Sequence, residues 1–216
     1  MKLFIRIFIF FIISGFCLKA QTGILQTRDV QDENQITVKK DFTYQCFGGT
    51  IGNYSYDGSY EVGYQSTWFY GSSQSCQDNR QIEYRTGFKF QMPIPSNGVL
   101  NSVKVRNTST YSGALVELPI NSQSLSAPDF FSAVGSGSSI SDMPNTNWVD
   151  ITSYASQFIS NGYFCLGALS SNSLGYISVQ CVIEWEIPAH ITFQNNMGGQ
   201  LSVNGSYYTG SFSDDY

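Results

Sequence analysis

The segment NYSYDGSYEVGYQSTWFYG, from Asn53 to Gly71, holds the densest group of side chains that could bind a ligand. Seven of its residues are aromatic, whereas only Asp57 and Glu61 are charged. Aromatic rings stack on the CH faces of sugars, and neighbouring amides and carboxylates bind the hydroxyl groups. We therefore predict a glycan-binding platform whose candidate ligand-binding residues are Tyr56, Tyr60, Tyr64, Trp68 and Tyr70.

The same aromatic segment can also be explained without a ligand. Aromatic residues are frequent in β-strands in any case. Tyr54, Tyr56, Tyr60 and Tyr64 have the same parity and would share one face of an unbroken strand. Asp57-Gly58 is a turn signal that interrupts this strand, so we expect the common face to be lost. Core packing and ligand binding are both open explanations of these rings.

Residues suited to catalysis are sparse. Ser-His-Asp chemistry would need His190, the only histidine, which lies near Pro188 in a predicted linker. Glu184 and Glu186 share the polar face of one strand, whereas a glycosidase needs two carboxylates across a cleft. We therefore expect no catalytic residues and no enzyme activity, and a polysaccharide-active enzyme is the less favoured alternative.

Metal binding has no clear motif. The loop carboxylates that could contribute to structural calcium are those of Asp57, Asp78, Asp129 and Asp142, but they lack EF-hand spacing. Without a CxxC motif, zinc is disfavoured. We expect no cofactor, leave structural calcium open and assign no metal ligands.

The first residues, MKLFIRIFIFFIISGFCLKAQ, are typical of a secretory signal peptide spanning residues 1–20, with a retained anchor as the alternative. Cleavage removes three basic residues and no acidic one, so the formal charge of −5 becomes −8. Such a chain repels nucleic acid and anionic lipid. We expect no nucleic-acid partner, no membrane span after cleavage and a secreted or cell-surface location.

Four cysteines follow the predicted cleavage site, and an even number in an exported chain predicts two disulfides. The apolar runs GYFCLGAL and GYISVQCVIEW flank the turn-rich segment SSNSL. A hairpin centred on Ser173 would place Cys165 opposite Cys181, close enough for a disulfide. We predict this bond and, by elimination, a second one between Cys46 and Cys76.

Apolar and polar residues alternate from Tyr176 to Ile187, and similar alternation recurs in GFKFQMP, LNSVKV and ALVELPI, as expected for strands. One helix is predicted, in WVDITSYASQFISNG, with Asp150 or Thr152 as its cap and Asn161-Gly162 as its end. Many short strands and one short helix predict an all-β sandwich or jelly roll over residues 42–188. Residues 21–41 are expected to form a leader, and residues 189–216 a β extension or the start of an incomplete second module.

The order of these segments resembles a known family. YRTGFKFQMPIPSNGVLNSVKV and NTNWVDITSYASQFISNGYFCLGALSS are similar to two segments of the DNRLRE-type jelly-roll modules of secreted and cell-surface bacterial proteins. The resemblance spans about residues 84–187 and implies a carbohydrate-binding or scaffold unit. We therefore expect a non-catalytic carbohydrate-binding or adhesive module with a polysaccharide or cell-surface glycan as its partner. The alternative is a structural spacer among further domains of a larger surface protein.

Overall fold

The computed structural model describes residues 16–21, 24–30, 35–59, 61–71, 75–109, 113–142, 147–188, 190–195, 200–203, 206–209 and 211–215. The chain forms two compact units, which we describe separately. The first unit contains Met1–Gln26, Pro95–Val99 and Trp185–Tyr216, and the second contains Thr27–Ile94 and Leu100–Glu184. Residues 1–15 of the predicted signal peptide lie outside the described residues.

The first unit contains two small antiparallel sheets. Strand β14 (His190–Asn195) pairs with β1 (Phe16–Gln21) on one edge and with β17 (Ser211–Asp215) on the other. Strands β15 (Gln200–Val203) and β16 (Ser206–Thr209) pair with each other. The predicted break near Pro188 coincides with the interval between β13, which ends at Ile187, and β14.

The second unit confirms the predicted all-β sandwich. The smaller sheet of the sandwich has the order β10 (Val149–Asp150), β7 (Val99–Asn107), β13 (Val179–Ile187) and β2 (Ile24–Val30), of which residues 24–26, 99 and 185–187 are assigned to the first unit. Its larger sheet has the order β12 (Gly175–Tyr176), β5 (Glu61–Tyr70), β6 (Gln77–Gln91), β11 (Tyr163–Leu169), β8 (Ala114–Leu118) and β9 (Ser139–Asp142). Two further strands, β3 (Ile36–Tyr44) and β4 (Thr50–Asp57), join the larger sheet through β6.

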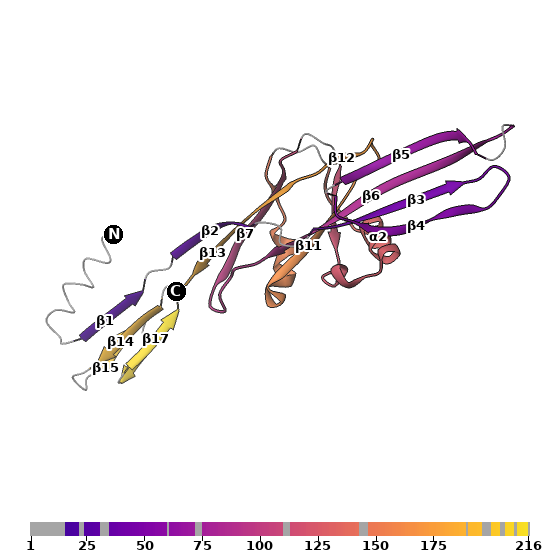
Figure 1. Cartoon of the computed structure of the whole chain (residues 1–216). Helices are drawn as coiled ribbons and strands as arrows, with labels where there is room; N and C mark the ends of the chain where they lie inside the picture. The colour runs from indigo at the N-terminus through magenta and orange to yellow at the C-terminus, as the bar shows by residue number, and fades with distance from the viewer. Residues whose placement is uncertain are drawn as a thin grey trace. The chain divides into compact units, whose positions relative to one another are not determined.

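Strand β6 is 15 residues long, and its two halves have different neighbours. Along one edge, residues 77–84 pair with β5 and residues 86–91 pair with β11. Along the other edge, residues 79–87 pair with β3, which pairs in turn with β4. Strands β4, β3 and β5 and residues 77–84 of β6 therefore form a four-stranded sheet, which we call the ribbon (Figure 1).

Buried hydroxyl groups connect the strands where the partners of β6 change. The Oγ1 atoms of Thr37 and Thr86 are 2.8 Å apart, and both residues are almost completely buried. Thr86 also donates a hydrogen bond to the carbonyl of Glu61, at the start of β5, while Thr37 donates to the carbonyl of Ser59. These bonds fix the position of β5 relative to β3 and β6, because buried polar groups hold a defined geometry when they are satisfied.

The predicted alternation of buried and exposed residues is confirmed in the sandwich. Phe88 and Phe90 of β6 and Met92, which directly follows β6, are buried, and Val103 and Val105 are buried along β7. In β13, Val179, Cys181, Ile183 and Trp185 are buried, whereas Ile187 at the end of the strand is half-buried. The long strand predicted from Tyr176 is instead divided, because residues 177–178 separate β12 from β13.

The predicted helix is present as α3 (Thr152–Ala155) followed by the 3₁₀ helix η2 (Ser156–Asn161). The N-cap position is Ile151 rather than Asp150 or Thr152, but Asp150 Oδ1 accepts a hydrogen bond at 2.8 Å from the backbone N–H of Thr152, the first residue of α3. Gly162 ends the segment with φ of 74°, a left-handed conformation that glycine adopts without steric cost. The Tyr154 and Phe158 rings are neighbours, with centroids 5.2 Å apart.

The expectation of a single helix is wrong, because a longer helix, α2 (Ala127–Ser136), follows the short 3₁₀ helix η1 (Ser122–Ser124). Ser126 caps α2 by accepting a hydrogen bond from the Asp129 N–H, and Pro128 lies in its first turn. The buried residues of α2 follow the helical spacing of i, i+3, i+4 and i+7, namely Ala127, Phe130, Phe131 and Val134. These signals are present in the sequence SAPDFFSAV.

Helix α2 packs on the larger sheet through two glycines that face each other. Gly87 of β6 lies opposite Gly167 of β11. A Cβ atom on Gly87 would lie 2.8 Å from Phe130 Cζ of α2, and one on Gly167 would lie 3.1 Å from Val134 Cγ1 of α2 and 2.8 Å from Val116 Cγ2 of β8. The missing side chains therefore allow α2 to approach the sheet closely.

The Gly87→Ala and Gly167→Ala substitutions should each lower the free energy of unfolding by about 1–3 kcal/mol, because added volume in a packed core forces neighbours apart. Chemical denaturation measures the change. Gly49→Ala is the control, because a Cβ atom there has no neighbour within 4 Å. Equal stability of Gly87→Ala and Gly49→Ala would contradict this packing.

The structure contradicts the predicted Cys165–Cys181 disulfide and confirms the one between Cys46 and Cys76. Strand β11 pairs with β6 and β8, not with β13, so the expected hairpin does not form. Cys165 packs with Phe130 and Leu118 on the α2 side of the larger sheet, whereas Cys181 is buried in the smaller sheet. Both cysteines are thiols. The predicted disulfide does not form because the two residues lie in different sheets.

Peptide mapping after alkylation under denaturing, non-reducing conditions should show Cys165 and Cys181 alkylated, and the Cys46 and Cys76 peptides joined. The structure predicts this result because only the latter pair is bonded. A cross-linked peptide that contains Cys165 and Cys181 would contradict the strand order.

The second unit begins earlier than the predicted boundary at residue 42. The expected leader, residues 21–41, contributes β3, and Val38 of this strand is fully buried with α2 residues. The ITVKK run is therefore part of the main sheet, and the compact unit starts at Thr27.

Candidate functional site

Aromatic side chains from three strands lie on one face of the ribbon. In an antiparallel sheet, opposed residues and residues two apart along a strand share a face. The strand register places Tyr44 of β3, Asn79 of β6 and Trp68 of β5 in one row. By the same register, the aromatic residues on this face, which we call the aromatic face, are Phe42, Tyr44, Tyr54, Tyr56, Tyr64, Trp68 and Tyr70.

The predicted turn between the two aromatic strands is present, but it does not disperse the rings. Strand β4 ends at Asp57, whose Oδ1 accepts a hydrogen bond from the Ser59 N–H at 2.9 Å, and β5 begins at Glu61. The expectation that the common face would be lost is wrong, because both strands belong to one sheet. Tyr56 and Tyr64 return to the same face through β3 and β6.

Helix α2 covers the part of the aromatic face that is nearest the sandwich. The Phe131 ring lies 5.1 Å from the Tyr54 ring, which lies 5.2 Å from the Phe42 ring. The guanidinium of Arg85 lies 3.9 Å from the centroid of the Phe131 ring. These contacts explain why this part of the face belongs to the core and cannot receive a ligand.

The far part of the aromatic face is open to solvent. Trp68 is 64% exposed, Tyr70 59% and Tyr44 39%. We define the ribbon tip as residues 44–51 and 68–79, excluding residues 72–74, which lie outside the described part of the chain. Of its exposed apolar and aromatic side chains, those of Tyr44, Trp68 and Tyr70 lie on the aromatic face, those of Ile51 and Phe69 lie on the opposite face, and that of Phe47 lies in the β3–β4 turn. A concentration of exposed apolar side chains of this kind marks an interaction site.

The predicted ligand-binding residues divide into two groups. Trp68 and Tyr70 lie in the ribbon tip and are accessible. Tyr56 is nearer the sandwich and is 52% exposed, but its hydroxyl is engaged, because it donates a hydrogen bond to the carbonyl of Leu125. Tyr64 is half-buried, and its backbone N–H donates to the carbonyl of Asn172 at 2.7 Å. Tyr60 lies outside the described residues.

The sequence pattern does not single out Tyr44 or Asn79, the other members of the Trp68 row. Both are far from Trp68 along the chain, and only the pairing of three strands brings them together. No local signal could have identified them, because strand register is set by non-local packing.

The opposite face of the ribbon is charged. Asp41 of β3 binds Arg80 of β6, with N–O distances of 2.6 and 2.9 Å, and Lys39 at 2.9 Å. The hydrogen bond from Arg80 and the neighbouring Lys39 lower the pKa of Asp41 to about 2. This carboxylate is therefore ionised across the physiological pH range and connects β3 to β6 on the face without the exposed Trp68 ring.

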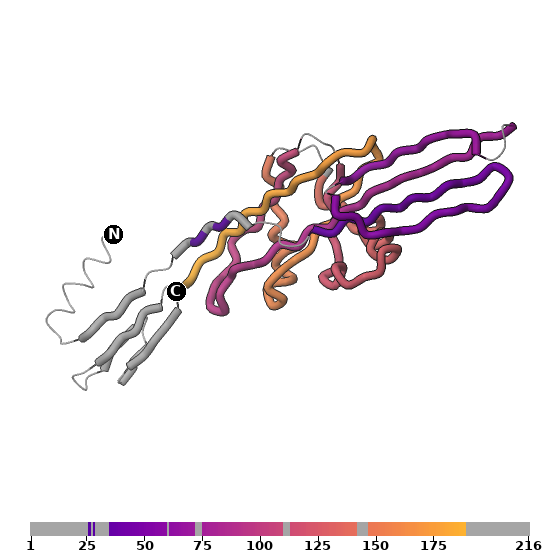
Figure 2. Tube along the Cα trace, viewed as in Figure 1, coloured from indigo at the N-terminus to yellow at the C-terminus, as the bar shows by residue number. Residues whose placement is uncertain are grey.

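A disulfide joins the two turns at the ribbon tip. Cys46 lies in the β3–β4 turn and Cys76 just before β6, and their Cα atoms are 6.1 Å apart. The Cys46 N–H also donates to Asp78 Oδ1 at 2.9 Å. Figure 2 shows the chain path through these two hairpins, whose turns are at the same end of the ribbon. The disulfide therefore holds together the strands that carry the exposed rings.

Replacing both cysteines, Cys46→Ser and Cys76→Ser, should lower the free energy of unfolding by about 3–4 kcal/mol, because the bond closes a long loop in the unfolded chain. The sequence separation of the two residues is 30. Urea denaturation of the double variant and of the parent, each with and without reductant, measures the change. The account fails if reductant leaves the stability of the parent unchanged although the bond is shown to be reduced.

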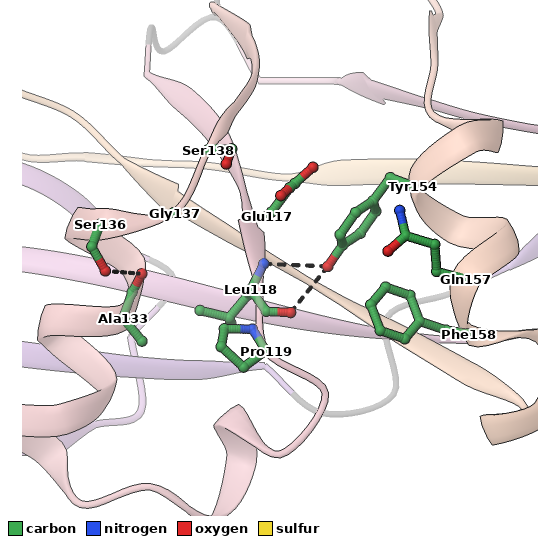
Figure 3. A pocket seen from close by; sticks show the side chains of 10 residues that line it. All are labelled: Glu117, Leu118, Pro119, Ala133, Ser136, Gly137, Ser138, Tyr154, Gln157 and Phe158. Carbon is green, nitrogen blue, oxygen red and sulfur yellow. Dashed lines mark hydrogen bonds between the residues drawn. The ribbon is translucent and has the colours of Figure 1, made fainter.

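A cavity of about 370 Å³ lies elsewhere in the second unit, between α2, β8 and the α3–η2 segment (Figure 3). The Tyr154 hydroxyl lies 2.6 Å from the carbonyl oxygen of Cys165 and 3.0 Å from that of Leu118. Burial raises the pKa of Tyr154 to about 12. This hydroxyl is therefore neutral and engaged with the backbone. The cavity lining includes one carboxylate, that of Glu117, whereas glycoside hydrolysis uses a pair.

The other predicted polar candidates have structural contacts. Glu184 accepts a hydrogen bond from Ser102 at 2.5 Å and lies 3.7 Å from Lys104 Nζ, whereas Glu186 is exposed. Among the aspartates considered for calcium, Asp57 and Asp78 accept backbone N–H groups and Asp129 lies in the α2 cap. The side chains of Asp142 and His190 are outside the described set.

Within the described residues, no three His, Cys, Asp or Glu side chains come together in an arrangement that could hold a metal ion. None of the described helices is both long and apolar enough to cross a membrane.

No family model, curated protein or solved structure matches this chain. The resemblance to DNRLRE-type modules is therefore a prediction from two sequence segments, and the functional argument depends on the geometry of the ribbon.

Proposed function

We propose that this chain is a non-catalytic, secreted or cell-surface module that binds carbohydrate or adheres to a glycan through the open part of its aromatic face. The observation that carries the proposal is the exposure of Trp68, Tyr70 and Tyr44 on one face of a disulfide-linked sheet. The resemblance to DNRLRE-type modules favours the same function.

Two properties of this surface support sugar binding, namely the fixed spacing of its rings and the polar groups beside them. An extended strand keeps its side chains at fixed spacing, so Trp68 and Tyr70 stand about 7 Å apart along β5. The amide of Gln81 and the hydroxyl of Ser66 lie on the same face between the aromatic rows. Rings with adjacent hydrogen-bonding groups are the surface that a sugar needs, since it presents CH faces and hydroxyls together.

The Trp68→Ala substitution should weaken binding of any glycan recognised by the parent by about tenfold or more, corresponding to about 1.4 kcal/mol. A glycan-array screen of the full chain identifies the glycan, and titration calorimetry measures the affinity. Trp148→Ala is the matched control, because Trp148 is also exposed but stacks on Arg106 at 4.5 Å, away from the ribbon.

Loss of affinity in Trp148→Ala but not in Trp68→Ala would place the site elsewhere. A parent chain that binds no glycan on the array would contradict the proposal and favour the spacer function.

A further inference from the structure

Asn79 occupies an unusual position beneath the exposed rings. It is 6% exposed, although it belongs to the open part of the aromatic face. In its row it lies between Tyr44 on β3 and Trp68 on β5. Because neighbouring strands are about 4.8 Å apart, the two aromatic residues stand about 10 Å apart with the amide midway between them.

Of the two polar atoms of the Asn79 side-chain amide, only the nitrogen has a hydrogen-bond partner. Its Nδ2 donates a hydrogen bond to Ser66 Oγ at 2.8 Å. Its Oδ1 is buried and accepts no hydrogen bond from the described residues. A buried acceptor without a donor destabilises a folded protein, so such groups are rare and require an explanation.

The rings around Asn79 can move enough to admit a donor. Trp68 is 64% exposed and Tyr44 39%, so core packing does not hold either ring in place. Exposed side chains change rotamer on the picosecond-to-nanosecond scale.

We propose that Asn79 Oδ1 is the polar recognition point of the aromatic face and accepts a hydrogen bond from a hydroxyl of a neutral sugar stacked on Trp68. This inference rests on the proposed carbohydrate-binding function and adds the class of sugar. A sugar hydroxyl supplies the missing donor. The neutral class follows from the formal charge of −5 of the chain, since the carboxylate of an acidic sugar would be repelled.

Two substitutions of Asn79 distinguish a role in sugar binding from a role in the stability of the fold. Asn79→Leu removes the acceptor and keeps the approximate shape. Asn79→Asp keeps acceptor oxygens, and the Ser66 hydroxyl can donate to the new carboxylate. We expect Asn79→Leu to weaken binding of the neutral glycan by about tenfold, equal to about 1.4 kcal/mol, and Asn79→Asp to stay within about threefold of the parent.

Thermal unfolding gives a readout that a purely structural role would not produce. Because the Leu variant removes an unsatisfied buried acceptor, its melting temperature should equal or exceed that of the parent while its affinity falls. A lower melting temperature together with equal losses of affinity in both variants would overturn the inference.

The two proposals fail in distinguishable ways. If the parent binds no glycan, or if Trp68→Ala binds like the parent, the proposed function is wrong. If Trp68→Ala abolishes binding but Asn79→Leu retains full affinity, the rings bind sugar and Asn79 does not recognise it. Preference of the parent for acidic over neutral glycans on the array would also overturn the assignment of sugar class.

Discussion

The change of partners along strand β6 is the constraint on which the second unit depends. One 15-residue strand belongs to the sandwich through β11 and to the ribbon through β5, while β3 crosses from one region to the other along its opposite edge. The change occurs between Tyr84 and Thr86, and Gly87 follows directly. Thr86 is held by buried hydroxyl contacts with Thr37 and Glu61, and Gly87 leaves room for helix α2. This continuity joins the ribbon to the sandwich, whereas β3–β6 pairing and the Cys46–Cys76 disulfide join the two hairpins of the ribbon to each other.

The two faces of the ribbon have different chemistry. One face stabilises the pairing of the strands, and the other exposes aromatic rings for binding. On one face, Arg80 and Lys39 bind Asp41 and connect neighbouring strands. On the other, α2 covers the residues nearest the sandwich and leaves the rings of the ribbon tip in solvent. The disulfide between Cys46 and Cys76 stabilises the tip where little hydrophobic core exists. The tip can therefore display aromatic groups while the strands beneath them stay ordered.

Local sequence patterns predicted much of this structure. Period-two alternation identified the buried residues of β6, β7 and β13, and capping residues identified the α3–η2 segment. Helix α2 was missed although Ser126, Pro128 and the spacing of Phe130 and Val134 indicated it. The Cys165–Cys181 pairing was wrong because it assumed that successive apolar runs pair as a hairpin, whereas they belong to different sheets. The Tyr44–Asn79–Trp68 row could not be predicted, since it depends on the register of three strands.

A crystal structure of this protein bound to a neutral oligosaccharide tests the central claim most directly, which is that β6 brings rings from separate hairpins onto one recognition surface. We expect a sugar ring stacked on Trp68, with one hydroxyl within hydrogen-bonding distance of Asn79 Oδ1 and Tyr44 on the far side. Side chains of Tyr44 and Trp68 on opposite faces of the ribbon, or a sugar bound away from both, would contradict the account.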